Sequence, residues 1–167
     1  MGNRATVIFT DGKGEFSPAV YLHWNGGPES VYGFLEELNR RKARSDQDYE
    51  CARFIELVGE FFDQDNFGST SLGVTNGPES DRLEDLEKVA TDHGDNGFYL
   101  VNRTSEEMQV RRFKEAYQHE PFKCLGLVEM APADVANERE AAYKDKYGLL
   151  KEEFAKIAND RPVSKFG

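Results

Sequence analysis

The sequence is poor in cysteine, histidine and tryptophan, and it contains no long apolar run. Its 167 residues include two cysteines, three histidines and one tryptophan. Cys51 and Cys124 are too few and too far apart for the disulfide framework of a small secreted domain, so we expect buried, reduced thiols. No apolar segment approaches the roughly 20 residues that a transmembrane helix needs, and no signal-peptide pattern opens the chain. These absences predict a cytoplasmic protein that does not contact a membrane.

Basic residues are outnumbered by acidic ones. There are 21 lysines and arginines against 31 aspartates and glutamates, which gives a net charge of −10. This balance argues against direct binding of nucleic acid, which requires a basic face. It permits binding to a basic protein, such as one that itself handles nucleic acid, although acidity can equally serve only to keep a protein in solution.

Catalytic and metal-binding motifs with the required spacing are absent as well. The sequence has no Gly-x-Ser-x-Gly elbow, no phosphate-binding glycine pattern and no cysteine in a recognisable catalytic setting. We therefore predict no catalytic residue, no metal ion and no cofactor, and expect a protein that is not an enzyme. The binding candidates that remain are seven residues at one strand end and in one turn: His23, Trp24, Asn25, Asp92, His93, Asp95 and Asn96.

Alternating and helical patterns predict an α+β fold. Residues 4–10 and 19–24 read as two strands of an antiparallel hairpin, because a glycine-rich turn separates two short β-type runs. Apolar residues after Pro28 recur at helical spacing, and a second helix follows it. We expect a small, mostly antiparallel sheet packed against helices, with a C-terminal helical segment. The predicted division is a core domain (1–130), a helical appendage (131–159) and a tail (160–167).

The segment Met108–Phe113 is ambiguous between strand and helix. Its β-type residues suit a strand that returns beside 98–101, whereas Val110, Phe113 and Tyr117 also fit one helical face. We favour the strand. Further along, Pro132 is expected to begin a long charged helix that breaks near Gly148.

One strand-to-helix junction occurs twice, as Asn25-Gly26-Gly27-Pro28-Glu29-Ser30 and as Asn76-Gly77-Pro78-Glu79-Ser80. Asparagine and glycine favour a turn, and proline suits the first position of a helix, so helices should begin at Pro28 and Pro78. A helix N-terminus after glycines can bind an anion. The glutamate within each junction can take that place instead, because it satisfies the helix dipole internally.

The run Tyr21-Leu22-His23-Trp24-Asn25-Gly26-Gly27 resembles a motif of small uncharacterised proteins of bacteria, phages and plasmids. Later features extend the resemblance: Phe61-Phe62 at a helix end, the Ser71–Val74 run, and Asp95-Asn96-Gly97 before Tyr99. The match covers about residues 1 to 103 and leaves out the C-terminal third. It implies a genetic context, that of accessory proteins of mobile elements, and no activity or catalytic residue.

Two hypotheses follow for function. The first is a non-enzymatic protein-binding accessory protein, such as an anti-CRISPR or anti-restriction inhibitor of a host defence system, that contacts a basic nucleic-acid-binding surface on its target. The second is a small enzyme or ligand-binding domain whose pocket lies around His23 and the Asp92–Asn96 turn. The sequence leaves the oligomeric state open.

Overall fold

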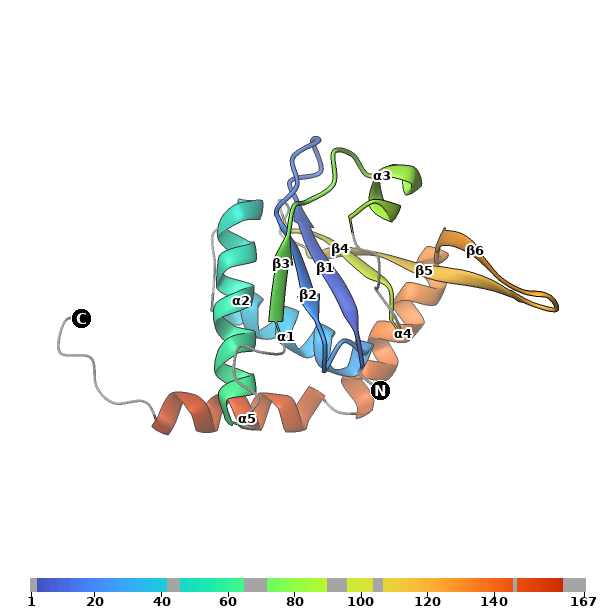
Figure 1. The fold of residues 1–167 in the computed structure, drawn as a ribbon. Coiled ribbons are helices and arrows are strands. Elements are labelled where there is room, and N and C mark those ends of the chain that lie inside the picture. Colours follow the sequence, from blue (N-terminus) through green and yellow to red (C-terminus); the bar gives the residue numbers. More distant parts are fainter. Residues whose placement is uncertain are drawn as a thin grey trace.

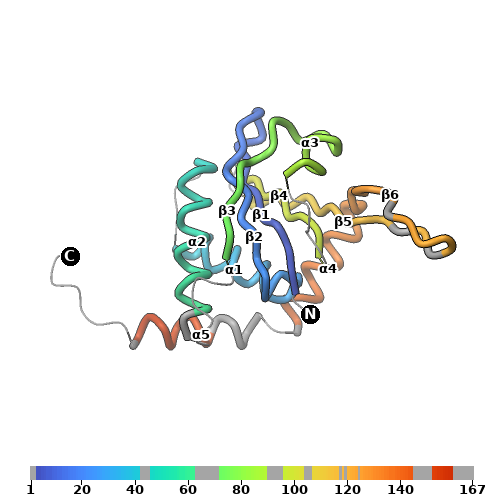
Figure 2. Tube along the Cα trace, viewed as in Figure 1, coloured from blue at the N-terminus to red at the C-terminus, as the bar shows by residue number. Residues whose placement is uncertain are grey.

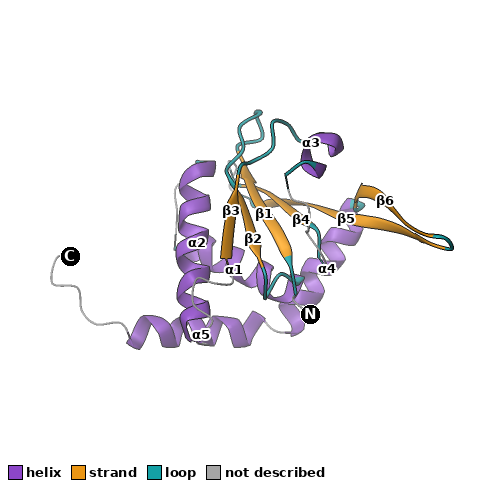
Figure 3. Ribbon diagram, viewed as in Figure 1, coloured by secondary structure: helices purple, strands orange, loops and turns teal. Residues whose placement is uncertain are grey.

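The fold is a single mixed β-sheet with helices packed on it (Figure 1). The computed structural model describes residues 3–41, 46–64, 72–89, 96–103, 107–145 and 147–160. Figure 3 distinguishes the helices, strands and loops of these residues. In chain order the elements are β1 (Ala5–Thr10), β2 (Ala19–Leu22), α1 (Pro28–Arg40), α2 (Gln47–Gln64), β3 (Leu72–Thr75), α3 (Leu83–Glu87), β4 (Phe98–Asn102), β5 (Gln109–His119), β6 (Phe122–Glu129), α4 (Pro132–Asp145) and α5 (Tyr147–Asp160).

The sheet confirms the predicted fold class. Its strand order is β3-β2-β1-β4-β5-β6, and every neighbouring pair is antiparallel except β1 with β4. The predicted hairpin of β1 and β2 forms, with Thr6 opposite Tyr21. Its turn is organised by Asp11, whose carboxylate accepts the N–H groups of Lys13 and Glu15 at 2.7 and 3.0 Å. Such local capping is the usual role of aspartate in a turn.

The main core lies between the sheet and helices α1, α2, α4 and α5, which share one face (Figure 2). The aromatic ring of Phe34 on α1 shows how closely these helices are joined. Its centroid lies 6.3 Å from Phe54 and 5.2 Å from Phe61, both on α2, and 6.1 Å from Phe154 on α5. Edge-to-face packing of this kind adds stability beyond the buried area alone.

The opposite face of the sheet has a smaller core. Only α3 covers it among the described helices, through Leu86, and the face remains partly open. The described residues that form the buried cluster on this side are Ile8, Ala19, Leu86, Phe98, Leu100, Phe113 and Leu127. None of the described helices is both long and apolar enough to cross a membrane.

The structure resolves the ambiguous C-terminal segments. Residues Met108–Phe113 lead into strand β5, as favoured, and the strand continues to His119 because β6 pairs with it beyond the end of β4. The helix that begins at Pro132 ends at Asp145, and α5 starts two residues later, close to the expected break. Phe154 and Ile157 of α5 lie in the main core. The division into core domain, appendage and tail stays a prediction.

One predicted helix start is wrong. Helix α1 begins at Pro28 as expected, but no helix begins at Pro78, and α3 covers only Leu83–Glu87. The physical reason lies in Ser80, whose hydroxyl accepts the N–H of Arg82 and donates to the carboxylate of Asp85. These bonds hold the residues after Pro78 in a turn and delay the helix.

A buried arginine joins the sheet to the helical layer. The Arg112 side chain is fully buried, and its Nε lies 2.7 Å from Oε1 of Glu138 on α4. Its Nη1 donates to the carbonyl oxygens of Asn96 and Phe98, at 2.5 and 3.0 Å. The guanidinium also stacks on Tyr99, 3.8 Å from the ring centroid. The polar groups of the Arg112 side chain therefore all have partners, as burial of an arginine requires.

Two tyrosines extend this contact to α1. The Tyr99 hydroxyl donates to the carbonyl oxygen of Gly26 at 2.8 Å, and the Tyr32 hydroxyl donates to Glu138 at 3.4 Å. Burial raises the pKa of both phenols, so both remain neutral donors at physiological pH. The network thus connects β4, β5, α1 and α4.

Replacing Arg112 by leucine should destabilise the protein by about 3 to 5 kcal/mol, because two backbone carbonyls lose this donor in the interior and Glu138 loses its nearest cation. Urea denaturation followed by circular dichroism measures this loss. The matched control is Arg53→Leu, which breaks an exposed ion pair with Glu56 at 2.8 Å and should cost less than about 1 kcal/mol. Equal losses in the two variants would contradict the assigned role of Arg112.

Candidate functional site

The predicted strand-end candidates His23 and Trp24 are half-buried among aromatic rings. The Nδ1 atom of His23 lies 3.0 Å from the hydroxyl of Tyr21, and its ring meets that of Trp24 edge to face at 5.3 Å between centroids. Trp24 packs against the main core. The environment of His23 is that of a histidine packed at the end of a strand.

Asn25 serves the turn that follows this strand. Its φ is 59°, in the left-handed region that asparagine adopts more readily than most residues. Its side-chain amide donates to the hydroxyl of Ser30 at 3.0 Å, across the start of α1. The polar groups of Asn25 are therefore used to connect β2 to α1.

The structure brings Asn96 to the end of the sheet where Asn25 lies. The backbone and side-chain N–H groups of Asn96 both donate to the carbonyl oxygen of Arg4, at 3.1 and 3.2 Å, while Gly26 donates to Asn3 at 2.7 Å. These bonds hold two loops, the one after β2 and the one before β4, against the residues that lead into β1. Asp92, His93 and Asp95 lie outside the described residues, so a site shared with them stays a prediction.

The two copies of the repeated junction lie at opposite ends of β2. The first follows Leu22, whereas the second follows Thr75, which pairs with Ala19. A Cβ atom at Gly26 would lie 2.6 Å from the carbonyl oxygen of Asn3, and one at Gly77 would lie 2.1 Å from that of Ser17. Both glycines therefore allow a close approach to neighbouring backbone. Since the copies do not converge, they do not form one anion site.

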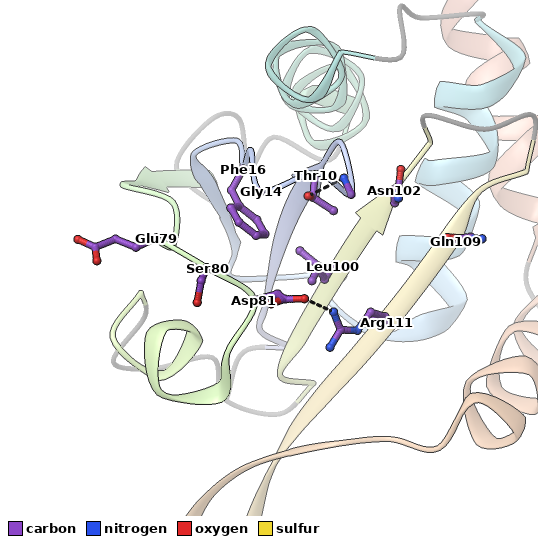
Figure 4. A pocket seen from close by; sticks show the side chains of 11 residues that line it. Thr10, Gly14, Phe16, Glu79, Ser80, Asp81, Leu100, Asn102, Gln109 and Arg111 are labelled. Carbon is purple, nitrogen blue, oxygen red and sulfur yellow. Dashed lines mark hydrogen bonds and ion pairs between the residues drawn. The ribbon is translucent and has the colours of Figure 1, made fainter.

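A cavity of about 390 Å³ opens on the partly covered face, where the parallel strands β1 and β4 end (Figure 4). The carboxyl ends of parallel strands are a common place for ligands in open sheets. Among the lining groups, Leu100 and Phe16 are apolar, and the amides of Asn102 and Gln109 come from neighbouring strands. The full lining is Thr10, Gly12, Gly14, Phe16, Glu79, Ser80, Asp81, Leu100, Asn102, Gln109 and Arg111.

An ion-pair cluster borders this cavity. Arg111 contacts Asp81 at 2.8 Å and makes two hydrogen bonds of 2.9 Å to the carboxylate of Glu129. The neighbouring guanidinium holds the pKa of Glu129 below its ordinary value. Arg111 already has two carboxylate partners, and through them it connects β5 to β6 and to the 79–81 segment. It is poorly placed to recruit an anionic ligand.

The groups that line the cavity can bind a polar ligand. The described residues among them include neither histidine nor cysteine, and of the two carboxylates Asp81 is paired with Arg111 while Glu79 is exposed. In the described part of the chain, no group of three or more potential metal-ligating side chains gathers. Sequence reasoning missed this cavity because the parallel pairing of β1 with β4 joins segments about 90 residues apart, and no local pattern signals it.

The other titratable group of interest is Glu50, in the first turn of α2. Its side chain is fully buried, and neither carboxylate oxygen has a hydrogen-bond partner, although Nη1 of Arg103 lies 3.1 Å from Oε1. Burial raises the pKa of Glu50 to about 7, and Arg103 only partly offsets this effect. A raised pKa in a cleft can mark a functional acid. Glu50 is not among the residues that line the cavity, and its contact joins α2 to the end of β4.

Glu50 should make stability fall as pH rises from about 4.5 to about 7. The folded state holds the proton up to about pH 7, whereas an ordinary glutamate loses it near 4.5, so ionisation penalises the folded state by roughly 3 kcal/mol above this window. Urea unfolding of the wild type and of Glu50→Gln at pH 4.5, 6 and 8 isolates this contribution. The wild type should lose stability relative to the variant as pH rises, and a constant difference would contradict the assignment.

The residues that lead into and form α3 present a fixed acidic surface. Residues 79–87, here named the acidic segment, hold five carboxylates and one arginine, a net charge of −4. Four of the carboxylates are exposed, and Asp85 is buried. Asp81 is bound to Arg111, and Glu87 accepts the N–H of Leu127 at 2.8 Å. The segment is therefore attached to both β5 and β6.

A second surface feature is the hairpin of β5 and β6, which extends beyond the rest of the molecule (Figure 1). We name residues 114–128 the arm. Beyond Phe113, the last partner of β4, the only described strand beside β5 is β6. Large apolar side chains are exposed along it: Phe122 by 73%, Leu125 by 56% and Val128 by 52%. The arm therefore exposes large apolar side chains at three separate positions.

Comparison with protein-family models, with curated proteins and with solved structures gave no match.

Proposed function

We propose that this chain is a non-enzymatic accessory protein that binds a basic protein partner through its acidic segment. The single observation that carries the proposal is that segment: exposed carboxylates held in fixed positions on an acidic protein. A nucleic-acid-binding surface is the kind of partner surface that offers complementary positive charge. The more specific form is an inhibitor of a host defence system, of the anti-CRISPR or anti-restriction type.

The attachment of the segment supports this proposal. The hydrogen bonds of Ser80 and the ion pair of Asp81 hold the backbone, so binding requires little further ordering of the chain. Glu84 is exposed by 66% and pairs with the similarly exposed Arg82 at 3.2 Å. Such a surface pair contributes little to stability and can exchange for a partner's lysine or arginine.

The acidity of the whole chain supports the same reading. A net charge of −10 attracts a basic partner over long range and raises its association rate, while it repels nucleic acid. The resemblance to small proteins of phages and plasmids adds a context in which such inhibitors occur. The described groups that line the cavity, Glu79 and Ser80 among them, include neither histidine nor cysteine.

Charge reversal tests the proposal. Affinity capture from the source organism at about 50 mM salt should retain a basic protein that about 300 mM salt releases, because exposed charge contacts are screened. Glu79→Lys/Glu84→Lys should reduce the affinity of the purified partner at least about tenfold, as loss of interfacial charge complementarity does. Nucleic acid bound by that partner should compete with the wild-type protein.

The matched control for this experiment is Glu152→Lys/Glu153→Lys, which makes the same charge change at exposed positions of α5. It should retain nearly full affinity beyond the small effect of changed net charge. Equal losses in the two double variants would show that only the overall charge matters. Failure to retain any protein at low salt would remove the proposal altogether.

A second candidate function is the binding of a small polar molecule in the cavity of Figure 4. The observation that favours it is the position of the cavity at the carboxyl ends of β1 and β4, between two strands whose amides face it. This candidate retains a ligand-binding function and puts forward a different site from the expected pocket around His23 and the Asp92–Asn96 turn.

A thermal-shift screen with small neutral and cationic molecules tests this candidate. A ligand present at about 100 times its Kd should stabilise the protein by about 2.7 kcal/mol, and Asn102→Leu/Gln109→Leu should abolish that stabilisation. His23→Ala should leave it unchanged, because His23 does not line the cavity. If His23→Ala abolishes the shift and the amide variants do not, the site lies elsewhere.

A further inference from the structure

A second cavity, of about 670 Å³, lies between β5 and α4, and we name it the α4 groove. Its apolar surface comes from Val110 of β5, from Met130, which follows β6, and from Val135 of α4. Arg139 and Tyr143, farther along α4, add polar groups. A cavity of this volume accommodates a small molecule, and an apolar lining with a few polar groups is typical of ligand sites.

The edge of β5 that borders the α4 groove is open for a short stretch. The described strand on this side, β6, pairs with β5 farther along the strand and not here. The carbonyl oxygen of Arg112 accepts the N–H of Met130 at 2.8 Å, and that of Met108 accepts a hydrogen bond from Nη1 of Arg139 at 3.3 Å. Because alternate residues of a strand direct their backbone groups to the same edge, the N–H and C=O of Val110 face the groove between these two bonds.

The length of this open stretch decides what kind of molecule it suits. Addition of an extended peptide to a sheet edge relies on several main-chain hydrogen bonds in a row. Met108 and Arg112 already have partners, so a peptide strand would gain the backbone groups of Val110 alone among the described residues. The stretch therefore suits a single polar head group better than a strand.

Arg139 is a half-buried cation of the groove that lacks a carboxylate partner. Among the described residues it forms no ion pair, whereas Arg111, Arg112 and Lys144 each bind a carboxylate. Its Nε donates to the hydroxyl of Tyr143 at 3.0 Å, and its Nη1 donates to Met108. A guanidinium has five N–H groups, so those of Nη2 remain for an acceptor. These two bonds fix its orientation in advance, and the planar fork of an arginine matches a carboxylate.

The acidic groups near the groove leave this cation available. Glu129 and Glu140, which line the groove, are bound at 2.9 Å by Arg111 and Lys144. Glu36 accepts a hydrogen bond from the Tyr143 hydroxyl at 3.1 Å, so it meets Arg139 through that hydroxyl. A ligand with two negative charges would be repelled by Glu129 and Glu140, whereas a single negative charge can be matched by Arg139.

We propose that the α4 groove binds a small molecule that carries one carboxylate and an apolar body. The donors available to the carboxylate are Nη2 of Arg139 and the N–H of Val110, and the apolar body covers Met130 and Val135. An uncharged or cationic molecule of the same shape would leave Arg139 without a counter-charge. This proposal is independent of the functions proposed for the acidic segment and for the cavity of Figure 4.

Isothermal titration calorimetry of the full chain with octanoate tests the proposal. We expect a Kd of about 1 mM or below, and binding of octanol and of octylammonium at least about tenfold weaker, because neither supplies a negative charge. A leucine-rich pentapeptide with an amidated C-terminus should not bind. Absence of octanoate binding, equal binding of octanoate and octanol, or tighter binding of the peptide overturns the proposal.

Variants then locate the site. Arg139→Gln should weaken octanoate binding at least about tenfold and leave the weak binding of octanol unchanged. The matched control is Arg53→Gln, which makes the same charge change on α2 and should keep the affinity within about twofold. Asn102→Leu, in the cavity of Figure 4, should also have no effect, because Asn102 does not line the groove. Equal losses in Arg139→Gln and Arg53→Gln overturn the assignment.

A second pair of variants keeps the test valid if Arg139→Gln does not fold. Ala136 is exposed and lines the groove one turn before Arg139, so substitutions there leave the bonds of Arg139 intact. Ala136→Glu supplies Arg139 with a carboxylate at i,i+3 and should weaken octanoate binding at least about tenfold. Ala136→Gln has nearly the same shape without the charge and should bind within about threefold of the wild type. Equal affinities of these two variants for octanoate overturn the proposal.

Discussion

The contact between Arg112 and Glu138 is the interaction on which the remaining architecture depends. A six-stranded sheet whose helices lie mostly on one side needs a connection at the point where the last strands leave the body. Arg112 supplies it from β5, because one guanidinium binds a carboxylate of α4, two carbonyls beside β4 and the face of Tyr99. A buried charge is costly unless it is fully paired, so these partners have to be in place together. The positions of α4, of the 96–98 turn and of β5 are thereby determined jointly.

The two faces of the sheet have different roles as a consequence. The helical face is filled by aromatic and aliphatic side chains from α1, α2, α4 and α5, and it provides the stability of the fold. The other face carries α3, the cavity at the ends of β1 and β4, and the root of the arm. A surface that is only partly covered leaves room for contacts with other molecules. The features that support the proposed functions accordingly gather there.

Local patterns were sufficient to predict much of the fold. The β-type runs in 4–10 and 19–24, and the helical spacing after Pro28, identified elements whose stability comes from nearby residues. The start at Pro78 was wrong because Ser80 forms a local turn that competes with a helix. The cavity was not predictable, since it depends on β1 lying beside β4. Arg112 was not singled out, because nothing in the sequence indicates that Glu138 faces it. Of the seven predicted site residues, Asn25 and Asn96 lie at the same end of the sheet, where each holds a loop through its own hydrogen bonds.

The bond between Glu87 and the N–H of Leu127 has a consequence for assembly. The outer edge of β6 is a row of backbone groups on which further chains could add strand by strand. The Glu87 carboxylate accepts a hydrogen bond from one of these N–H groups, and the bulge at Gly126 interrupts the regular hydrogen-bonding pattern beside it. The opposite edge strand, β3, has only four residues. Further strands are therefore hindered from adding at either edge of the sheet. The protein can thus expose an apolar hairpin without providing a template for fibrous aggregation.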